Sequence, residues 1–159
     1  MRRNSSGISP VVATVILVAI AIVIAIAVAF WASGLVGVFT RFEKLEMTSV
    51  YATPTGTPNQ YDITIIAKNT GSSSATVDKL LLNGVPICEI GAGGNWGKTG
   101  SAPTGFTINS CGDITATALN PGNQTQVTIT VTAPSAGITV EVALHTASGK
   151  LYPYSVLLS

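Results

Sequence analysis

The stretch ISPVVATVILVAIAIVIAIAVAFWASGLVGVFT, residues 8–40, decides the fold of this chain. It contains no charged side chain, and apolar residues occupy every side of the helix that it would form. A helix that is apolar all round must be buried in lipid or among other helices. At about 1.5 Å per residue the stretch would extend roughly 50 Å, which exceeds the roughly 30 Å hydrocarbon core of a bilayer. This length predicts a role beyond plain membrane anchoring.

The residues inside the stretch favour a helix that packs among other helices. Pro10 follows Ser9, and proline is tolerated in the first helical turn because its missing N–H would be unpaired there. Small residues fall on several faces, which lets neighbouring helices approach closely on all sides. Phe30 and Trp31 are interpreted as interface aromatics at the outer end of a membrane span before assembly. The pattern suits a bundle of many helices better than a dimer.

From Met47 onward the pattern changes to short β-type runs separated by turn residues such as Asn83-Gly84. The strand candidates are 49–53, 61–68, 76–82, 85–90, 105–108, 113–119, 126–133, 138–146 and 150–158. Val127, Ile129 and Val131 share one face of their run, and threonines occupy the other. The expected fold class is α+β: a long N-terminal hydrophobic α-helix followed by an antiparallel β-sandwich head of the immunoglobulin-like type.

Charge is scarce in this chain and is spread evenly. Charged residues make up 9% of the sequence, and from Arg41 onward six Lys/Arg stand against seven Asp/Glu. Because no basic patch forms, nucleic acid is not an expected partner. The head is instead rich in threonine, serine, glycine and asparagine, which suits a surface kept soluble by hydroxyls and amides or by attached sugars. Intracellular enzymes seldom have this composition.

Cys88 and Cys111 are the two cysteines of the chain, and both lie in the head. A zinc site needs three or four cysteine or histidine ligands, and only His145 remains to help. We therefore expect a disulfide, with two separate buried thiols as the alternative. Closing a loop of about 24 residues stabilises a fold by roughly 3 kcal/mol in the chain-entropy model. The bridge would indicate an oxidising exterior or a hyperthermophile.

The chain offers little for catalysis. It has one histidine and seven scattered carboxylates, with no GxSxG, P-loop, HExxH or paired-acid motif. Asp78, Glu141 and His145 are interpreted as solvated strand or turn residues. Trp96, in the glycine-rich stretch 91–105, is interpreted as packing that surface loop onto the head, with a sugar-contacting or surface-adhesive aromatic as the alternative. We expect neither enzymatic activity nor a cofactor or metal.

The segment RRNSSGISPVVAT, residues 2–14, resembles the class III signal and mature N-terminus of archaeal type IV pilins. In that family a prepilin peptidase cuts a short basic leader after a small residue, and the hydrophobic stretch is kept. The resemblance puts the cut between Gly7 and Ile8, with Ser9 and Pro10 at the helix start. Bacterial type IV pilins usually carry a glutamate at the fifth mature position, where this chain has Val12. That departure favours the archaeal branch.

The resemblance, which covers about the first 40 residues, implies three parts. These are a leader (1–7), a hydrophobic assembly helix (8–47) and a β-rich globular head (48–159). It implies a structural subunit of an extracellular archaeal type IV adhesion pilus, a homopolymer whose helices form the filament core. The precursor would rest in the cytoplasmic membrane, where an assembly ATPase and a membrane platform protein act on it. The finished filament would lie at the cell surface and attach to surfaces or other cells.

Other interpretations of the same N-terminus stay open. A secretory signal peptide cut after Ala27-Val28-Ala29 would need an unusually long core, because 7 to 15 apolar residues are typical there. A membrane-anchored or secreted β-domain binding protein is a second alternative. Within the pilin-like proteins, an archaellin of a motility filament or a minor pilin shares the helix and the β-rich head. The sequence separates motility from adhesion poorly.

One N-glycosylation sequon lies in the head. Asn123-Gln124-Thr125 sits in a turn, which is a surface position. Asn4-Ser5-Ser6 also fits the motif, but it lies in the expected leader and would be lost. Asn123 is therefore the candidate site that would make the mature chain a glycoprotein.

Overall fold

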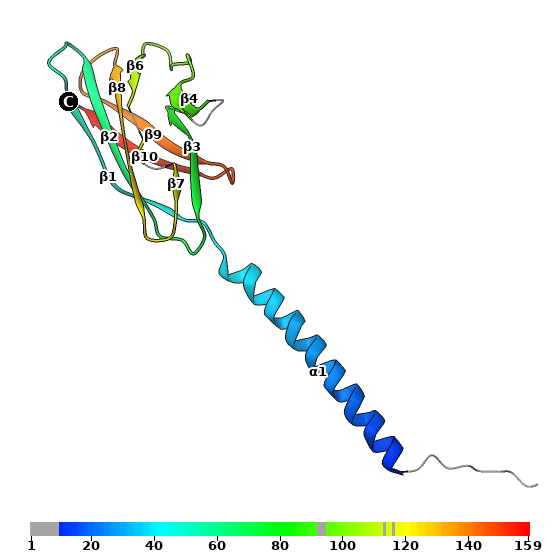
Figure 1. Ribbon diagram of the computed structural model, residues 1–159. Coiled ribbons are helices and arrows are strands. Elements are labelled where there is room, and N and C mark those ends of the chain that lie inside the picture. The colour runs from blue at the N-terminus through cyan, green and yellow to red at the C-terminus, as the bar shows by residue number, and fades with distance from the viewer. Residues whose placement is uncertain (1–9, 92–94, 113, 116) are drawn as a thin grey trace, which may run out of the picture. The chain divides into compact units, whose positions relative to one another are not determined.

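The computed structural model describes residues 10–91, 95–112, 114–115 and 117–159, with only the backbone described at 38–40. The expected cleavage residues Gly7 and Ile8, and Ser9 at the expected helix start, lie outside the described residues. The chain divides into two compact units, Met1–Arg41 and Phe42–Ser159. Figure 1 shows the helix of the first unit and the strands of the second.

The helix α1 runs from Pro10 to Thr40 and contains 31 residues. Two hydroxyl side chains of the helix, Thr14 and Ser33, are satisfied without water. Thr14 Oγ1 donates to the Val11 carbonyl at 2.8 Å, and Ser33 Oγ donates to the Ala29 carbonyl at 2.8 Å. Such back-bonding satisfies these two hydroxyls inside the helix, which suits an apolar medium.

The head begins earlier along the chain than residue 48. Strand β1 (Leu45–Pro54) pairs with β2 (Gln60–Asn69) from the pair Leu45↔Asn69 onward. Leu45 is 4% exposed and belongs to the core of the head. A buried leucine on a paired strand cannot continue a helix, so the expected helix 8–47 stops short: α1 ends at Thr40, and the two units meet between Arg41 and Phe42.

The head consists of antiparallel strands in two sheets. The first has the order β1-β2-β8-β6, with β8 at Gln124–Thr132 and β6 at Thr107–Cys111. The second has the order β10-β9-β3-β4-β5: β10 is Leu151–Leu158, β9 Ile138–Thr146, β3 Ala75–Leu82, β4 Val85–Ile90 and β5 Trp96–Lys98. A short strand, β7 (Ala118–Leu119), pairs with the start of β3.

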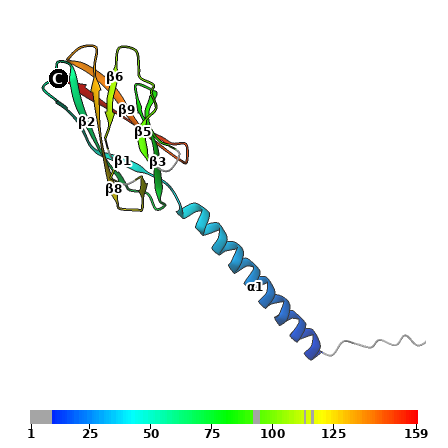
Figure 2. The ribbon, with the colours of Figure 1, turned by 45° about the horizontal axis from the view of Figure 1, so that its top comes forward.

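These strand orders match those of a variable-type immunoglobulin domain, ABED in one sheet and GFCC′C″ in the other. The first sheet, in the order β1-β2-β8-β6, corresponds to strands A, B, E and D of that scheme. The second sheet, in the order β10-β9-β3-β4-β5, corresponds to strands G, F, C, C′ and C″. Figure 2 shows the two layers from a second side. The predicted α+β class, with a hydrophobic helix followed by an antiparallel sandwich, is confirmed.

One strand departs from the expectation for the glycine-rich stretch 91–105. That stretch was expected to be a surface loop, but Trp96–Lys98 forms β5, which pairs with β4 through Ile90↔Trp96 and Cys88↔Lys98. Glycine weakens strand propensity, so composition alone hides this strand. Trp96 is half-buried and packs against the core, as its interpretation as a packing residue predicts.

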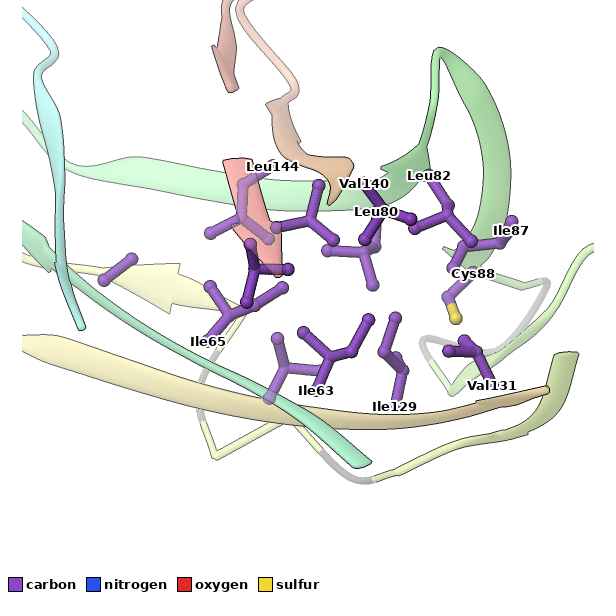
Figure 3. Packing of buried hydrophobic residues seen from close by; sticks show 14 of the residues in the cluster. Ile63, Ile65, Leu80, Leu82, Ile87, Cys88, Ile129, Val131, Val140 and Leu144 are labelled. Atoms are coloured by element: carbon purple, nitrogen blue, oxygen red, sulfur yellow. The ribbon is translucent and has the colours of Figure 1, made fainter. Parts of the chain in front are cut away.

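The core lies between the two sheets (Figure 3). Ile63, Ile65 and Ile129 of the first sheet point toward Leu80 and Leu144 of the second, and all five are 0% exposed. Removing such a side chain from water stabilises the fold by about 1.5–3 kcal/mol. The alternation predicted for residues 127–131 holds, because Val127, Ile129 and Val131 are all buried.

Hydroxyl groups cover the opposite face of the first sheet. Thr130 Oγ1 donates to Asp62 Oδ1 at 2.7 Å, and Ser110 Oγ donates to Thr130 Oγ1 at 3.0 Å. The hydroxyls of Thr64 and Thr128 lie 3.1 Å apart. These side chains bond mainly to one another, so the face is rich in paired hydroxyl groups.

Candidate functional site: the exposed helix

The surface of α1 is the largest apolar feature among the described residues. Every described side chain from Pro10 to Gly37 is exposed. Val11 and Trp31 are each 68% exposed, and Phe30 is 76% exposed. Soluble monomers rarely expose apolar patches larger than a few hundred Å². In the part of the chain that the structure describes, Pro10–Gly37 is the one helix whose length and composition would allow it to cross a membrane.

The apolar surface of α1 has no polar side. Ile22, Val23 and Ile24 are consecutive and all more than half exposed, so they point in different directions around the helix axis. A soluble partner that covers a single stripe would leave the rest of this surface in water. Only a medium that surrounds the helix, either lipid or several other helices, covers all of it.

Small residues near the end of α1 leave room for such neighbours. A Cβ atom added at Gly34 or Gly37 would meet nothing within 4 Å. A larger side chain at either position would therefore have open space around its Cβ atom among the described residues. Glycines of this kind let the backbones of adjacent helices approach closely in membranes and in apolar bundles.

Cys88 and Cys111 form a disulfide in the structure, so they are not separate thiols. Their Cα atoms are 6.0 Å apart, and 23 positions separate them in sequence. Cys88 lies on β4 and Cys111 ends β6, so the bridge joins one sheet to the other. It also closes the segment that carries β5 and the glycine-rich residues.

The remaining predicted site residues lie apart from one another. Pro10 is the first residue of α1, as expected for a proline in the first turn. Asn123 is exposed in the turn before β8, where its backbone amide donates to the Asn120 carbonyl at 3.0 Å. Thr125, the third sequon residue, is 1% exposed, and its hydroxyl lies 3.2 Å from that of Thr115.

The head pairs two ionisable residues that were interpreted as separate solvated groups. Asp78 Oδ1 lies 2.5 Å from His145 Nδ1, with both side chains about one-quarter exposed. The two residues belong to β3 and β9, 67 positions apart, so only the strand register brings them together. Among the described residues, no group of three or more His, Cys, Asp or Glu side chains could hold a metal ion.

A shallow depression of about 240 Å³ lies beside β5 and β6. Its lining residues are Lys98, Gly100, Ser101, Ala102, Phe106, Thr107 and Ile108. Lys98 Nζ is directed to the backbone carbonyls of Ile108 and Asn109 at 3.4 and 3.3 Å. The lining therefore has one cationic side chain and no carboxylate or imidazole, which is a poor set for acid–base chemistry.

No protein-family model matches the chain, and no curated protein matches it significantly. Among solved structures, the archaellum periplasmic stator protein FlaG from Sulfolobus acidocaldarius is similar over 72% of this chain and 99% of its own, with 21% identity and a TM-score of 0.43. The Vibrio cholerae VesB protease is similar over 74% of this chain and 32% of its own, with 15% identity and a TM-score of 0.40. The Iho670 flagellar-like filament is similar over 96% of this chain and 99% of its own, with 16% identity and a TM-score of 0.32. At these TM-scores the likenesses carry no conclusion about the function of this chain.

Proposed function

We propose that this chain is a structural subunit of an extracellular archaeal type IV adhesion pilus, in which α1 polymerises into the filament core. The observation that carries the proposal is a 31-residue helix, apolar on every side, whose described side chains are all exposed. Moving some twenty apolar residues from lipid into water costs tens of kcal/mol at about 25 cal/mol per Å². The helix must therefore pass from the membrane directly into a bundle of helices from earlier subunits.

The proposed assembly has two stages. The precursor rests in the cytoplasmic membrane with Arg2 and Arg3 on the cytoplasmic side, as positive residues flanking a span prefer. A prepilin peptidase then cuts between Gly7 and Ile8, which removes the charges that hold the helix in place. An assembly ATPase and a membrane platform protein supply the energy for the lift, as the pilin resemblance implies.

The head stays outside the membrane and surrounds the filament core. Its hydroxyl-rich outer face suits exposure to water without much charge, and the disulfide between Cys88 and Cys111 suits an oxidising exterior. Asn123 carries a glycan in this proposal. Because Thr125 is buried in the folded head, the glycan would be added before the turn closes.

The proposal assigns no catalysis to the head. The imidazole Nδ1 of His145 is already paired with Asp78. The depression beside β5 and β6 has Lys98 as the ionisable side chain of its lining. Neither arrangement provides a nucleophile with an adjacent base.

The test uses cells that lack the gene for this chain and cells that carry it again. Electron microscopy should show the filament missing in the first and restored in the second, and cell attachment to a surface should follow the filament. Unchanged filaments in the deletion strain would contradict the proposal. Loss of swimming with attachment intact would identify an archaellin instead, and a trace of this chain in filaments of another protein would identify a minor pilin.

A further inference from the structure

We propose that the turn between β2 and β3 is a mechanical clamp that transfers the pull on α1 into both sheets of the head. This inference rests on the proposed function, in which the helix is drawn out of lipid and the head must follow while it stays folded. The pull reaches the head at residues 42–44, which lie between the end of α1 and the start of β1.

Backbone carbonyls in this entry segment are bonded to the head. The amides of Thr70 and Gly71 donate to the Lys44 carbonyl at 2.9 and 3.2 Å. Lys150, in the connection between β9 and β10, donates from Nζ to the Glu43 carbonyl at 2.8 Å. Two separate loops therefore hold consecutive residues of the segment.

Phe42 is held still more completely by the same turn. The amides of Ser72 and Ser73 donate to the Phe42 carbonyl at 2.9 and 3.1 Å. The Phe42 amide donates in return to Ser72 Oγ at 3.0 Å. The carbonyls of all three residues in the segment thus accept hydrogen bonds from the folded head.

Only glycine fits at the centre of the clamp. A Cβ atom at Gly71 would lie 2.5 Å from the Phe42 carbonyl oxygen and 2.6 Å from the Lys44 nitrogen, closer than real Cβ contacts allow. Both contacts are to backbone atoms of the entry segment, which a side-chain rotation cannot move. The requirement at Gly71 is therefore close approach of two backbones.

Asn69, which is 0% exposed, holds this turn from inside the head. Its Oδ1 accepts the Gly71 amide at 2.9 Å, and its Nδ2 donates to the carbonyls of Ser73 and Leu119, each at 2.8 Å. A buried amide with these partners resists displacement, because each broken bond would leave a buried polar group unpaired.

The clamp changes how a pull acts on the sandwich. β1 is the edge strand of its sheet and pairs with β2 from Leu45↔Asn69, so a pull at Leu45 alone would open this ladder one pair at a time. The clamping turn instead connects β2 of the first sheet with β3 of the second. A pull that enters through the turn is divided between both sheets before it reaches β1.

The first test measures local opening in the full chain, purified in detergent micelles. Trypsin cuts after Arg41 and after Lys44, at the two ends of the clamped segment 42–44, and after Lys79 inside β3. Gly71→Ala should speed cleavage after Lys44 by at least about tenfold and leave cleavage after Lys79 at the wild-type rate. Gly97→Ala is the matched control, because a Cβ atom there meets nothing within 4 Å, and it should behave as wild type.

The second test applies the pull itself by single-molecule force spectroscopy between the two termini of the full chain. In Gly71→Ala an early event should appear at reduced force as residues 42–54 leave the head, a segment whose contour length is roughly 45 Å at about 3.3–3.6 Å per residue. In wild type and in Gly97→Ala that early event should be absent. If Gly71→Ala fails to fold, Ser72→Ala and Lys150→Met each remove one clamp bond and should raise cleavage after Lys44 about two- to fivefold.

Equal cleavage after Lys44 in wild type and Gly71→Ala would overturn the clamp. So would a loss of protection at Lys79 that matches the loss at Lys44, because that pattern is global unfolding. Neither test uses filaments. A chain that never enters a filament would contradict the proposed function, but the two tests would still show whether the turn acts as a clamp.

Discussion

Asn69 shows how much of the head depends on one buried amide. It makes side-chain hydrogen bonds to three backbone groups, and its backbone amide donates to the Asn123 carbonyl at 2.9 Å. Asn69→Ala should lower the free energy of unfolding by about 2–4 kcal/mol, because two carbonyls and one amide lose their side-chain partner. Denaturant unfolding of the full chain in detergent measures this change.

Asn95 provides the matched control for that measurement. It is exposed, and its backbone carbonyl accepts the Gly91 amide at 2.8 Å. Asn95→Ala keeps this backbone bond and should change the stability by no more than about 0.5 kcal/mol. A similar loss in both variants would contradict the special role of Asn69.

Tyr152 should respond to alkaline pH. Partial burial raises its pKa above the usual 10.0, and the charge of Glu43 raises the pKa further. At pH values between the usual pKa and the raised pKa, the folded state therefore keeps the hydroxyl proton of Tyr152, while the unfolded chain has lost it. The contribution of Tyr152 to the free energy of unfolding is therefore complete below pH 10.0. It is lost as the pH rises through the pKa that Tyr152 has in the folded state.

The measurement is a spectroscopic titration of phenolate absorbance in the folded full chain. Wild type should show a tyrosine that ionises above the usual range, and Tyr152→Phe should lack this component and lose less stability at alkaline pH. If all tyrosines ionise at the usual pKa in wild type, the described environment of Tyr152 is incorrect.

At the scale of elements, a charge in the middle of α1 should separate membrane insertion from assembly. Val23 is 66% exposed near the centre of the helix. Val23→Glu should still insert, since one charged residue costs about 2.5–3.5 kcal/mol at the centre of a membrane span. It should be missing from filaments, because a helix bundle would bury the carboxylate without a partner.

Val23→Leu is the conservative control and should assemble as wild type does. The two variants are compared by immunoblot of the membrane fraction and of sheared filaments. Filaments built from Val23→Glu at the wild-type level would show that this part of α1 is not enclosed by other helices.

The elements themselves were largely predictable from local pattern. The run 138–146 was predicted as a strand and is β9 with the same bounds, because its alternating apolar residues report a half-buried strand directly. The apolar stretch predicted a helix, which is observed at Pro10–Thr40; it ends before residue 47, where the predicted assembly helix ended. β5 was not predictable, because its glycine-rich sequence has no periodic signal and it is held by pairing with β4.

At the scale of the whole molecule, the contacts between distant segments were beyond prediction. The proximity of Asp78 and His145 depends on the register of β3 with β9, and the contact of Gly71 with Phe42 depends on where the chain enters the sandwich. Asn69-Thr70-Gly71 consists of residues that favour turns. Nothing local indicates that its glycine lies against the entry segment.

The disulfide was the long-range contact that could be anticipated. Two cysteines without further metal ligands leave few alternatives, and the structure joins Cys88 to Cys111 across the two sheets. The remaining strands pair so that two apolar faces are buried against each other. Alternation shows which residues share a face, but it does not give the partner strand or the register.

The most direct test of the central claim is the intact mass and N-terminal peptide mass of the dominant protein in filaments sheared from cells, with and without reductant and deglycosylation. We predict a mature chain that begins at Ile8, gains the mass of two hydrogens on reduction and loses a glycan from Asn123. A start at Ile8 retains the whole of α1, as the proposed filament subunit requires. A chain that begins at Phe30, or an uncut chain confined to membranes, would contradict the account.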